Sequence, residues 1–296
     1  MTPMNLRDLQ YLVALAETRH FGHAAERCHV SQPTLSAQLR KLEEFLGVTL
    51  IERRPRRVGL TPAGEAVVER ARRMLRDADD IRALARARQD PLAGQLKVGF
   101  IPTLGPYLLP RIAPRIAKAL PRLQLVLHEY QTAPLVDRVV GGELDLAVLA
   151  LPAETKGLVT RSLFAEAFLV AMPEHHRLAA KKRVKPSDLA DEKLLLLEEG
   201  HCLRDQALEV CELAGAKEQD FRATSLETLR QMVAAGLGVT LLPRLAAEGP
   251  FASARGLVVR PFAPPAPNRV IGAAWRRSTS RTEAIAAVCD VIARTG

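Results

Sequence analysis

The residues with the clearest chemical potential lie in one short segment centred on Cys202. Cys202 follows His201 and precedes Arg204, and both neighbours can carry positive charge. A cation near a thiol favours the thiolate, which is the form of cysteine that reacts with oxidants. The segment therefore predicts a reactive cysteine, with a small structural core residue as the alternative, since free cysteines commonly have that role.

A second cysteine, Cys211, follows nine positions later. The apolar run Leu194–Leu197 predicts a buried strand, and 204–213 predicts a helix closed by Gly215. Cys202 would lie near the N-terminus of that helix, where the positive end of the helix dipole favours a thiolate. On a continuous helix the two cysteines would be separated by roughly 13.5 Å of rise and would point to opposite faces. A disulfide requires Cα atoms within about 7 Å, so the two can bond only if the helix between them unfolds.

Composition sets limits on the rest of the chain. Its 296 residues are 48% hydrophobic, which allows a large buried core and predicts two domains. The formal net charge of +9 suits a polyanionic partner but does not by itself establish one. No apolar run approaches the ~18 residues of a transmembrane helix, and the N-terminus lacks the apolar core of a signal peptide. We therefore expect a cytoplasmic protein with no membrane partner.

The remaining cysteines do not indicate a structural framework. Cys28, Cys202, Cys211 and Cys289 are too scattered for a set of disulfides, which are in any case uncommon in the cytoplasm. They also lack the paired short spacings of a zinc site. We expect no metal and no cofactor, and we expect Cys28 and Cys289 to be core residues.

The N-terminal segment predicts three short helices. Apolar residues at helical spacing predict the first helix over Leu9–Ala16, and Phe21–Cys28 predicts the second. Ser31 is a good N-cap and Gly47 a good C-cap for the third. Two helices joined by such a turn are typical of a helix-turn-helix. The third helix would carry polar side chains on its outer surface, namely Gln32, Thr34, Ser36, Gln38 and Arg40.

A basic hairpin and a long helix are predicted next. Glu52–Thr61 contains Arg53, Arg54, Arg56 and Arg57. A charged run is usually only a solvated surface, but beside a helix-turn-helix it favours a wing that grips phosphate. Pro62 to about Arg88 predicts one helix whose apolar stripe has nothing to cover it in an isolated domain, and Asp90–Gly94 ends it as a hinge.

From Gln95 onward, short apolar strands alternate with helices, which is typical of an α/β domain. The predicted strands are Leu96–Ile101, Leu123–His128, Leu144–Leu149, Phe168–Met172, Leu194–Leu197 and Val239–Leu242. The predicted helices are Tyr107–Ala119, Leu135–Val140, Thr224–Ala235 and Thr282–Ala293.

Several phrases of the N-terminal segment together resemble the winged helix-turn-helix of LysR-type transcription regulators. They are Phe21–Arg27, Val30–Ser36, Leu42–Glu43, Leu46–Gly47 and Thr61–Gly64. The resemblance implies an α/β protein with an all-α winged helix-turn-helix head that binds double-stranded DNA (1–61), a linker and dimerisation helix (62–90), and a two-lobed, periplasmic-binding-protein-like regulatory domain (91–296). One lobe is expected at about 95–165 and 270–296, the other at about 166–269.

The resemblance also implies which side chains contact DNA. Gln32, Pro33 and Ser36 are expected to approach base edges, while Arg53 and its neighbours hold the DNA backbone. The full expected set is Ser31, Gln32, Pro33, Thr34, Ser36, Gln38, Arg40, Arg53, Arg54, Arg56 and Arg57.

Within the LysR family most members bind a metabolite in the cleft between the lobes, but this sequence resembles the hydrogen-peroxide sensors of the family. The phrases are Ile101–Pro110, His128–Glu129 with Gln131–Thr132, Leu197–Ala207 and Phe221–Gly236. The resemblance implies that hydrogen peroxide oxidises Cys202, which then forms a disulfide with Cys211, and that antioxidant genes are the targets. It further implies a homotetramer, RNA polymerase as a partner, and glutaredoxin or thioredoxin as the reductant.

Five residues are expected to support the peroxide reaction. His201, Arg204 and Arg269 would favour the ionised thiol, the last by resemblance. Thr103 and Thr132 each follow a predicted strand and offer a hydroxyl that can donate to and accept from peroxide, although each could equally be a strand-end cap.

Three other functions are compatible with parts of this pattern. A LysR-type regulator could bind an organic effector, with Cys202 incidental. The C-terminal domain could instead be a thiol peroxidase, but the DNA-binding head would then have no purpose, so we expect a regulator and not an enzyme. A plain solute-binding protein conflicts with the missing signal peptide.

Overall fold

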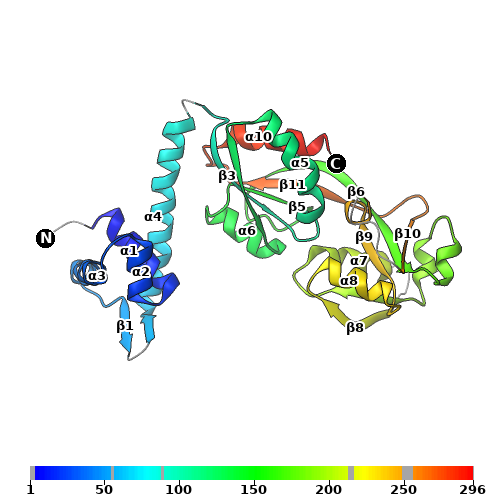
Figure 1. Cartoon of the computed structure of the whole chain (residues 1–296), viewed down its shortest axis with the longest axis horizontal. Coiled ribbons are helices and arrows are strands. Elements are labelled where there is room, and N and C mark those ends of the chain that lie inside the picture. The colour runs from blue at the N-terminus through cyan, green and yellow to red at the C-terminus, as the bar shows by residue number, and fades with distance from the viewer. Residues whose placement is uncertain (1–3, 55–56, 88–89, 213–216, 249–255, 296) are drawn as a thin grey trace. The chain divides into compact units, whose positions relative to one another are not determined.

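The structure is a computed structural model that describes residues 4–54, 57–87, 90–212, 217–248 and 256–295. It divides after Ala85 into two compact units (Figure 1). None of the described helices is both long and apolar enough to cross a membrane.

The first unit begins with three helices, α1 (Leu6–Thr18), α2 (Phe21–Arg27) and α3 (Gln32–Leu46). Their apolar faces meet in a core that includes Leu12, Leu35 and Leu39, each fully buried. The predicted caps of α3 are confirmed: Ser31 accepts a hydrogen bond from the Thr34 N–H, and Gly47 ends the helix in the left-handed conformation. Both ends of α3 are therefore determined by local sequence.

The predicted basic hairpin is also present, as β1 (Ile51–Arg54) and β2 (Arg57–Leu60). The Glu43 carboxylate of α3 accepts the backbone N–H groups of Leu50 and Ile51 at 2.8 and 3.0 Å, which attaches the hairpin to α3. The head is therefore three helices plus the two-stranded hairpin, as expected for a winged helix-turn-helix.

The predicted long helix is α4 (Pro62–Ala87). Its first turn packs against the residue that precedes the hairpin, because a Cβ on Gly64 would be 2.1 Å from the Leu50 carbonyl oxygen. Farther along, Met74 and Ile81 are 44% and 67% exposed. Part of the apolar stripe of α4 is therefore not covered by the described part of its own unit.

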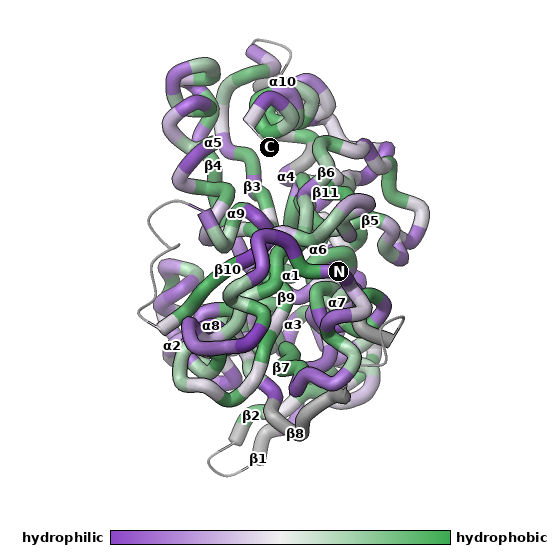
Figure 2. The backbone as a smooth tube through the Cα atoms, turned by 90° about the vertical axis from the view of Figure 1, so that its right-hand side faces the viewer, coloured by the Kyte–Doolittle hydropathy of each residue, from purple (hydrophilic) through white to green (hydrophobic). Residues whose placement is uncertain are grey.

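The second unit is α/β. Its main sheet has the strand order β10-β6-β11-β5-β3-β4, and β9 also pairs with β6. These strands are β3 (Gly94–Phe100), β4 (Leu123–Glu129), β5 (Leu146–Leu151), β6 (Val159–Pro173), β9 (Thr240–Pro243), β10 (Leu257–Pro261) and β11 (Asn268–Trp275). A separate parallel pair is formed by β7 (Lys193–Leu197) and β8 (Lys217–Ala223). The central strand β5 is hydrophobic in every residue (Figure 2).

Helices cover these sheets. They are α5 (Gly105–Ala119), α6 (Thr132–Val140), α7 (Cys202–Glu212), α8 (Leu226–Ala234), α9 (Arg244–Ala247) and α10 (Thr282–Ala293), with the short 3₁₀ helices η1 (Arg177–Ala180) and η2 (Pro186–Leu189). Every strand and helix predicted in this unit is present, and α7 starts two residues earlier than expected. The predicted end of that helix, Leu213 with Gly215, lies outside the described residues.

The elements that the sequence pattern missed are β8, β10, β11, α9, η1 and η2. Strand β8 is mostly polar, so it shows no apolar run, and its extended conformation is stabilised by pairing with β7. Helix α9 has four residues, which is too short for a periodic pattern.

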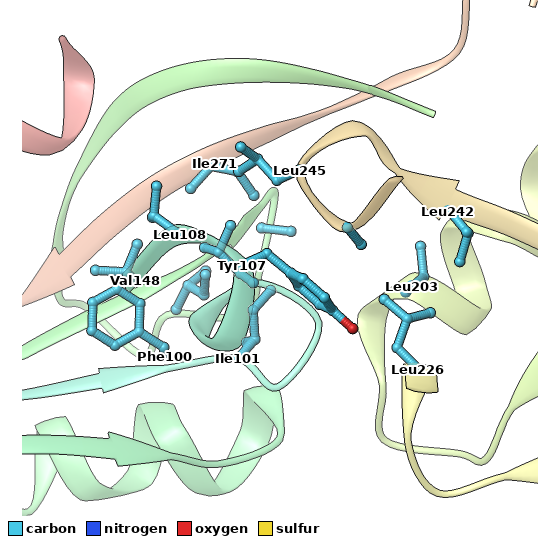
Figure 3. Close-up of a cluster of buried hydrophobic side chains, with 14 of the residues drawn as sticks. Phe100, Ile101, Tyr107, Leu108, Val148, Leu203, Leu226, Leu242, Leu245 and Ile271 are labelled. Carbon is cyan, nitrogen blue, oxygen red and sulfur yellow. The ribbon is translucent and has the colours of Figure 1, made fainter. Parts of the chain in front are cut away.

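Figure 1 shows two lobes in this unit, one with β3, β5, α5 and α6 and the other with α7, α8 and β8. Strand β6 belongs to both: 159–167 pair with β11, and 168–173 pair with β9 or β10. The predicted lobe limits therefore fall inside β6 and β11. The lobes share one buried apolar cluster, and Figure 3 shows the Tyr107 ring reaching from α5 toward Leu203 and Leu226 of the other lobe.

Candidate functional site

Two predicted site residues lie at the same edge of the main sheet. Strands β3 and β4 are parallel, and Phe100 is the register partner of Glu129. Thr103 comes three residues after Phe100, and Thr132 comes three residues after Glu129. Both threonines therefore lie where the carboxyl ends of the two strands meet. The prediction that both threonines follow strands is confirmed.

Thr103 is buried and bound to Arg269. One guanidinium nitrogen of Arg269, Nη1, donates to Thr103 Oγ1 at 3.0 Å, and Nη2 donates to the Thr103 carbonyl at 3.1 Å. The two residues lie 166 positions apart in the chain. The structure therefore brings together two of the residues expected to support the reaction.

Arg269 is neutralised by a carboxylate that the sequence analysis did not single out. Glu166 Oε2 accepts from Arg269 Nε and Nη2 at 2.9 and 2.8 Å, and both side chains are essentially inaccessible to solvent. Glu166 on β6 is the cross-strand partner of Arg269 on β11. The only sequence signal for Glu166 is an acidic residue beside an apolar strand segment, which does not reveal its partner.

The role expected of Arg269 is changed by this pairing. Its positive charge is countered by Glu166, and its remaining donors are directed at Thr103. A guanidinium engaged in this way orients the threonine. It is not a free cation available to a thiolate.

Thr132 is the first residue of α6, and its side chain ends in a hydroxyl. Its Oγ1 is buried, and no hydrogen-bond partner for it lies among the described residues. The preceding Gln131 is the N-cap of α6, and its side chain makes no cap hydrogen bond in the described structure. A buried hydroxyl without a partner is costly, which favours a site that a small polar molecule occupies.

The segment that leads into α7 lies against this edge. Gly200 has a φ of +93°, a conformation that suits glycine, and a Cβ added to it would be 2.6 Å from Gln131 Oε1. Gly200 belongs to one lobe and Gln131 to the other. The sequence around Cys202 and the α6 N-terminus are therefore in contact across the lobes.

Cys202 is the first residue of α7, as the sequence predicted for a cysteine near a helix N-terminus. Its thiol is free and half-buried, and it packs against the shared apolar cluster. Helix α7 is continuous from Cys202 to Glu212, so Cys211 lies on the same helix; the Cys211 side chain is outside the described part. Arg204 is half-buried in the first turn of α7, where its backbone N–H donates to the His201 carbonyl at 2.9 Å.

His201 has an environment that opposes a positive charge. It is 5% exposed, and burial lowers the pKa of its imidazole, although the nearby Glu198 and a hydrogen bond to the Thr224 backbone act in the opposite direction. The ring is therefore neutral at physiological pH. The lowered pKa disfavours His201 as a cation beside the Cys202 thiolate; a neutral imidazole can still donate one hydrogen bond.

The other two described cysteines have structural environments. Cys289 on α10 is fully buried, and burial raises the pKa of its thiol to about 11. Cys28 caps the C-terminal end of α2, is half-buried, and has its pKa raised by burial. Both therefore remain protonated thiols near neutral pH, which agrees with their predicted core roles.

The expected DNA-contacting residues of α3 are accessible to different degrees. Ser31, Gln32, Pro33, Thr34 and Arg40 are exposed, whereas Ser36 and Gln38 are half-buried. On the hairpin, Arg53 and Arg54 belong to β1 and Arg57 to β2, while Arg56 and the side chains of all four arginines lie outside the described part. The exposed face of α3 next to a basic hairpin can contact a polyanion.

Comparison with known proteins decides the family. Residues 6–65 match the bacterial regulatory helix-turn-helix proteins of the lysR family, and residues 89–296 match the LysR substrate binding domain. The chain belongs to the LysR family. The predicted family and the predicted fold class, a helix-turn-helix head with a two-lobed regulatory domain, are confirmed.

Relatives within the family are more specific. The chain is 51% identical to the DNA-binding transcriptional dual regulator OxyR of Escherichia coli K12 over 92% of this chain and 90% of that protein. A full-length OxyR variant from Pseudomonas aeruginosa has a TM-score of 0.77 and 44% identity, covering 99% of this chain and 95% of that one. A Corynebacterium glutamicum OxyR variant with hydrogen peroxide bound has a TM-score of 0.68 and 36% identity, covering 99% and 93%. These relatives are transcription regulators, and the similarity extends over both units.

Proposed function

We propose that this LysR-family chain is a DNA-binding transcription regulator activated by hydrogen peroxide. The observation that carries the proposal is the position of Cys202: a half-buried free thiol at the N-terminus of α7, in the segment where Gly200 lies against Gln131, the residue before Thr132. The nearby Thr132 hydroxyl, which has no hydrogen-bond partner among the described residues, supports binding of a small polar oxidant there. The similarity to OxyR proteins supports the same function.

The proposed chemistry begins with attack of the Cys202 thiolate on one peroxide oxygen. The S–O bond forms as the O–O bond breaks, giving a sulfenic acid and hydroxide. The Cys211 thiol then attacks the sulfenic sulfur, and a disulfide forms with release of water. Sulfur is oxidised by two electrons in total, and one peroxide is reduced to water.

The second step is incompatible with the observed helix. Cys202 and Cys211 are nine residues apart on α7, which corresponds to roughly 13.5 Å of rise, whereas a disulfide needs Cα atoms within about 7 Å. Formation of the bond must therefore unfold part of α7 and displace its own buried residues, such as Leu203 and Ala207, from the core. A covalent bond would thus select a second arrangement of the regulatory domain.

We assign the parts of the chain accordingly. Residues 1–61 contact double-stranded DNA, 62–90 link and dimerise, and 91–296 sense peroxide. The partly exposed apolar stripe of α4 supports pairing with a second copy, and a tetramer of two such dimers is the assembly we expect. We further propose that the activated regulator contacts RNA polymerase. Glutaredoxin or thioredoxin would then reduce the disulfide and complete the cycle.

A thiol-specific peptide map before and after one equivalent of hydrogen peroxide tests the proposal. We expect a new disulfide-linked pair of peptides containing Cys202 and Cys211, with Cys28 and Cys289 still alkylated after unfolding. A parallel footprint on operator DNA should change with the same peroxide dependence. An unmodified Cys202 in oxidised protein would contradict the proposal, and an organic-effector regulator would then be the better assignment.

A further inference from the structure

A buried hydrogen-bonded chain of three side chains crosses the regulatory unit from Glu166 through Arg269 to Thr103. Glu166 uses both carboxylate oxygens: Oε2 accepts from Arg269, and Oε1 accepts from the Leu245 N–H at 2.8 Å. Glu166 and Arg269 have side-chain exposures of 1% and 0%. Burial of two full charges is costly unless each is paired and hydrogen-bonded, as they are here.

This arrangement fixes the direction of the Thr103 hydroxyl. A guanidinium has five N–H donors and no acceptor, so Thr103 Oγ1 must accept from Arg269 Nη1. The hydroxyl proton is then left to be donated elsewhere, and Thr103 Oγ1 donates to no other described residue. Thr103 is therefore preset as a hydrogen-bond donor at the sheet edge where Thr132 also lies.

We propose that Glu166 is a positioning residue for the peroxide reaction: it holds Arg269, and through it presets Thr103 to donate a hydrogen bond to the departing peroxide oxygen. This role rests on the proposed function. When the Cys202 thiolate attacks, the electron pair of the O–O bond leaves with the distal oxygen, which departs as hydroxide. A preset donor stabilises the negative charge that develops on that oxygen.

Replacement of Glu166 by Gln tests the role at nearly constant size. Glutamine replaces one of the two carboxylate oxygens with an NH2 donor, so either Arg269 or the Leu245 N–H would face a donor in place of an acceptor. A matched control is Glu192→Gln, because Glu192 is also a buried carboxylate, paired with His176 and Arg177 at 3.0 and 2.6 Å in a different part of the unit.

Two reagents separate positioning from general damage. Peroxide attack produces a charged leaving oxygen that needs a donor, whereas alkylation of the same thiol by iodoacetamide needs only the thiolate. In the full chain we expect Glu166→Gln to slow Cys202 oxidation about tenfold and to leave alkylation unchanged, while Glu192→Gln changes neither. In a Thr103→Val background, Glu166→Gln should have no further effect on oxidation, because both changes remove the same donor.

Several results would overturn the role. One is oxidation of Cys202 in Glu166→Gln at the wild-type rate. Another is an equal decrease in the rates of oxidation and of alkylation. The third is that Glu166→Gln slows oxidation in the Thr103→Val background as much as it does in the wild-type background. If Glu166→Gln leaves Arg269 unpaired and fails to fold, the double variant Glu166→Gln with Arg269→Met removes both charges. This double variant should show slower oxidation of Cys202 and unchanged alkylation. Oxidation of the double variant at the wild-type rate would refute the role. A wild-type Cys202 that does not react with peroxide would instead overturn the proposed function itself.

Discussion

Gly200 and Gln131 are in direct contact: a Cβ added to Gly200 would lie 2.6 Å from Gln131 Oε1. Gly200 precedes His201 and Cys202, whereas Gln131 precedes Thr132 at the start of α6. The contact therefore determines how closely the reactive cysteine segment approaches the lobe that carries the threonines. Neither residue performs chemistry, but a larger side chain at Gly200 would separate the two lobes at this point.

Gly200→Ala should slow oxidation of Cys202 and lower stability. The left-handed backbone alone costs on the order of 1–3 kcal/mol with a side chain. Gly236→Ala is the control, because Gly236 has a φ of +89° and nothing within 4 Å of an added Cβ. We expect both variants to lose stability in urea titrations, but only Gly200→Ala to react more slowly with peroxide. Equal oxidation rates in the two variants would show that the contact with Gln131 has no effect on the site.

Thr132→Val should slow oxidation about 10²-fold without loss of stability, because the hydroxyl it removes has no described protein partner and a positioned donor contributes about 10²–10⁴ in rate. Thr240→Val is the contrasting variant. Thr240 is buried and donates to the Leu195 carbonyl at 2.8 Å, so its loss should lower the unfolding midpoint and leave oxidation unchanged. Stopped-flow oxidation and thermal unfolding measure the two effects. Wild-type oxidation in Thr132→Val would remove this residue from the site.

Replacing the two cysteines separately should separate sensing from switching. Cys202→Ser should not respond to peroxide, because a hydroxyl lacks the ionisation and nucleophilicity of a thiolate. Cys211→Ser should still be oxidised at Cys202, but should stop at the sulfenic acid and proceed to the irreversible sulfinic acid under excess oxidant. Because nothing then forces α7 to unfold, its DNA footprint should change less than in wild type. A change as large and lasting as in wild type would mean that oxidation of Cys202 alone is the trigger.

The neutral state of His201 predicts a dependence of stability on pH. Burial lowers its pKa below the ordinary value of 6.5, so the unfolded chain binds a proton at a higher pH than the folded chain. Stability should therefore fall as the pH decreases through about 6.5 toward the lowered folded pKa. Urea midpoints at pH 7.5 and 5.5 should differ less in His201→Gln than in wild type. The same difference in both proteins would contradict the assignment of a neutral, buried ring.

The two kinds of DNA contact should respond differently to mutation. Arg53→Ala should weaken binding to all sequences and reduce the dependence of affinity on salt, as loss of one phosphate contact does. Gln32→Ala should relax preference at one or two operator positions, because an amide side chain reads base edges. Affinities measured at several salt concentrations on matched and mismatched operators distinguish them. Unchanged affinity and salt dependence in both variants would mean that the reading surface lies elsewhere.

Signals close in sequence determined most elements of this protein. Ser31 and Gly47 set the ends of α3, and apolar runs such as Leu194–Leu197 set the interior strands. The order of strand and loop also determined that Thr103 and Thr132 follow strands. These features depend on caps, periodicity and turn residues, which act over a few positions.

Tertiary structure decided the partners and charge states. Arg269 meets Glu166 and Thr103, 103 and 166 positions away, because β11 pairs with β6 in a register that no local pattern encodes. The same holds for β8, a polar segment made extended by pairing with β7. His201 is neutral because the fold buries it, although its sequence neighbours suggested a cation. Pairing register and desolvation are properties of the assembled chain, so they became visible only in the structure.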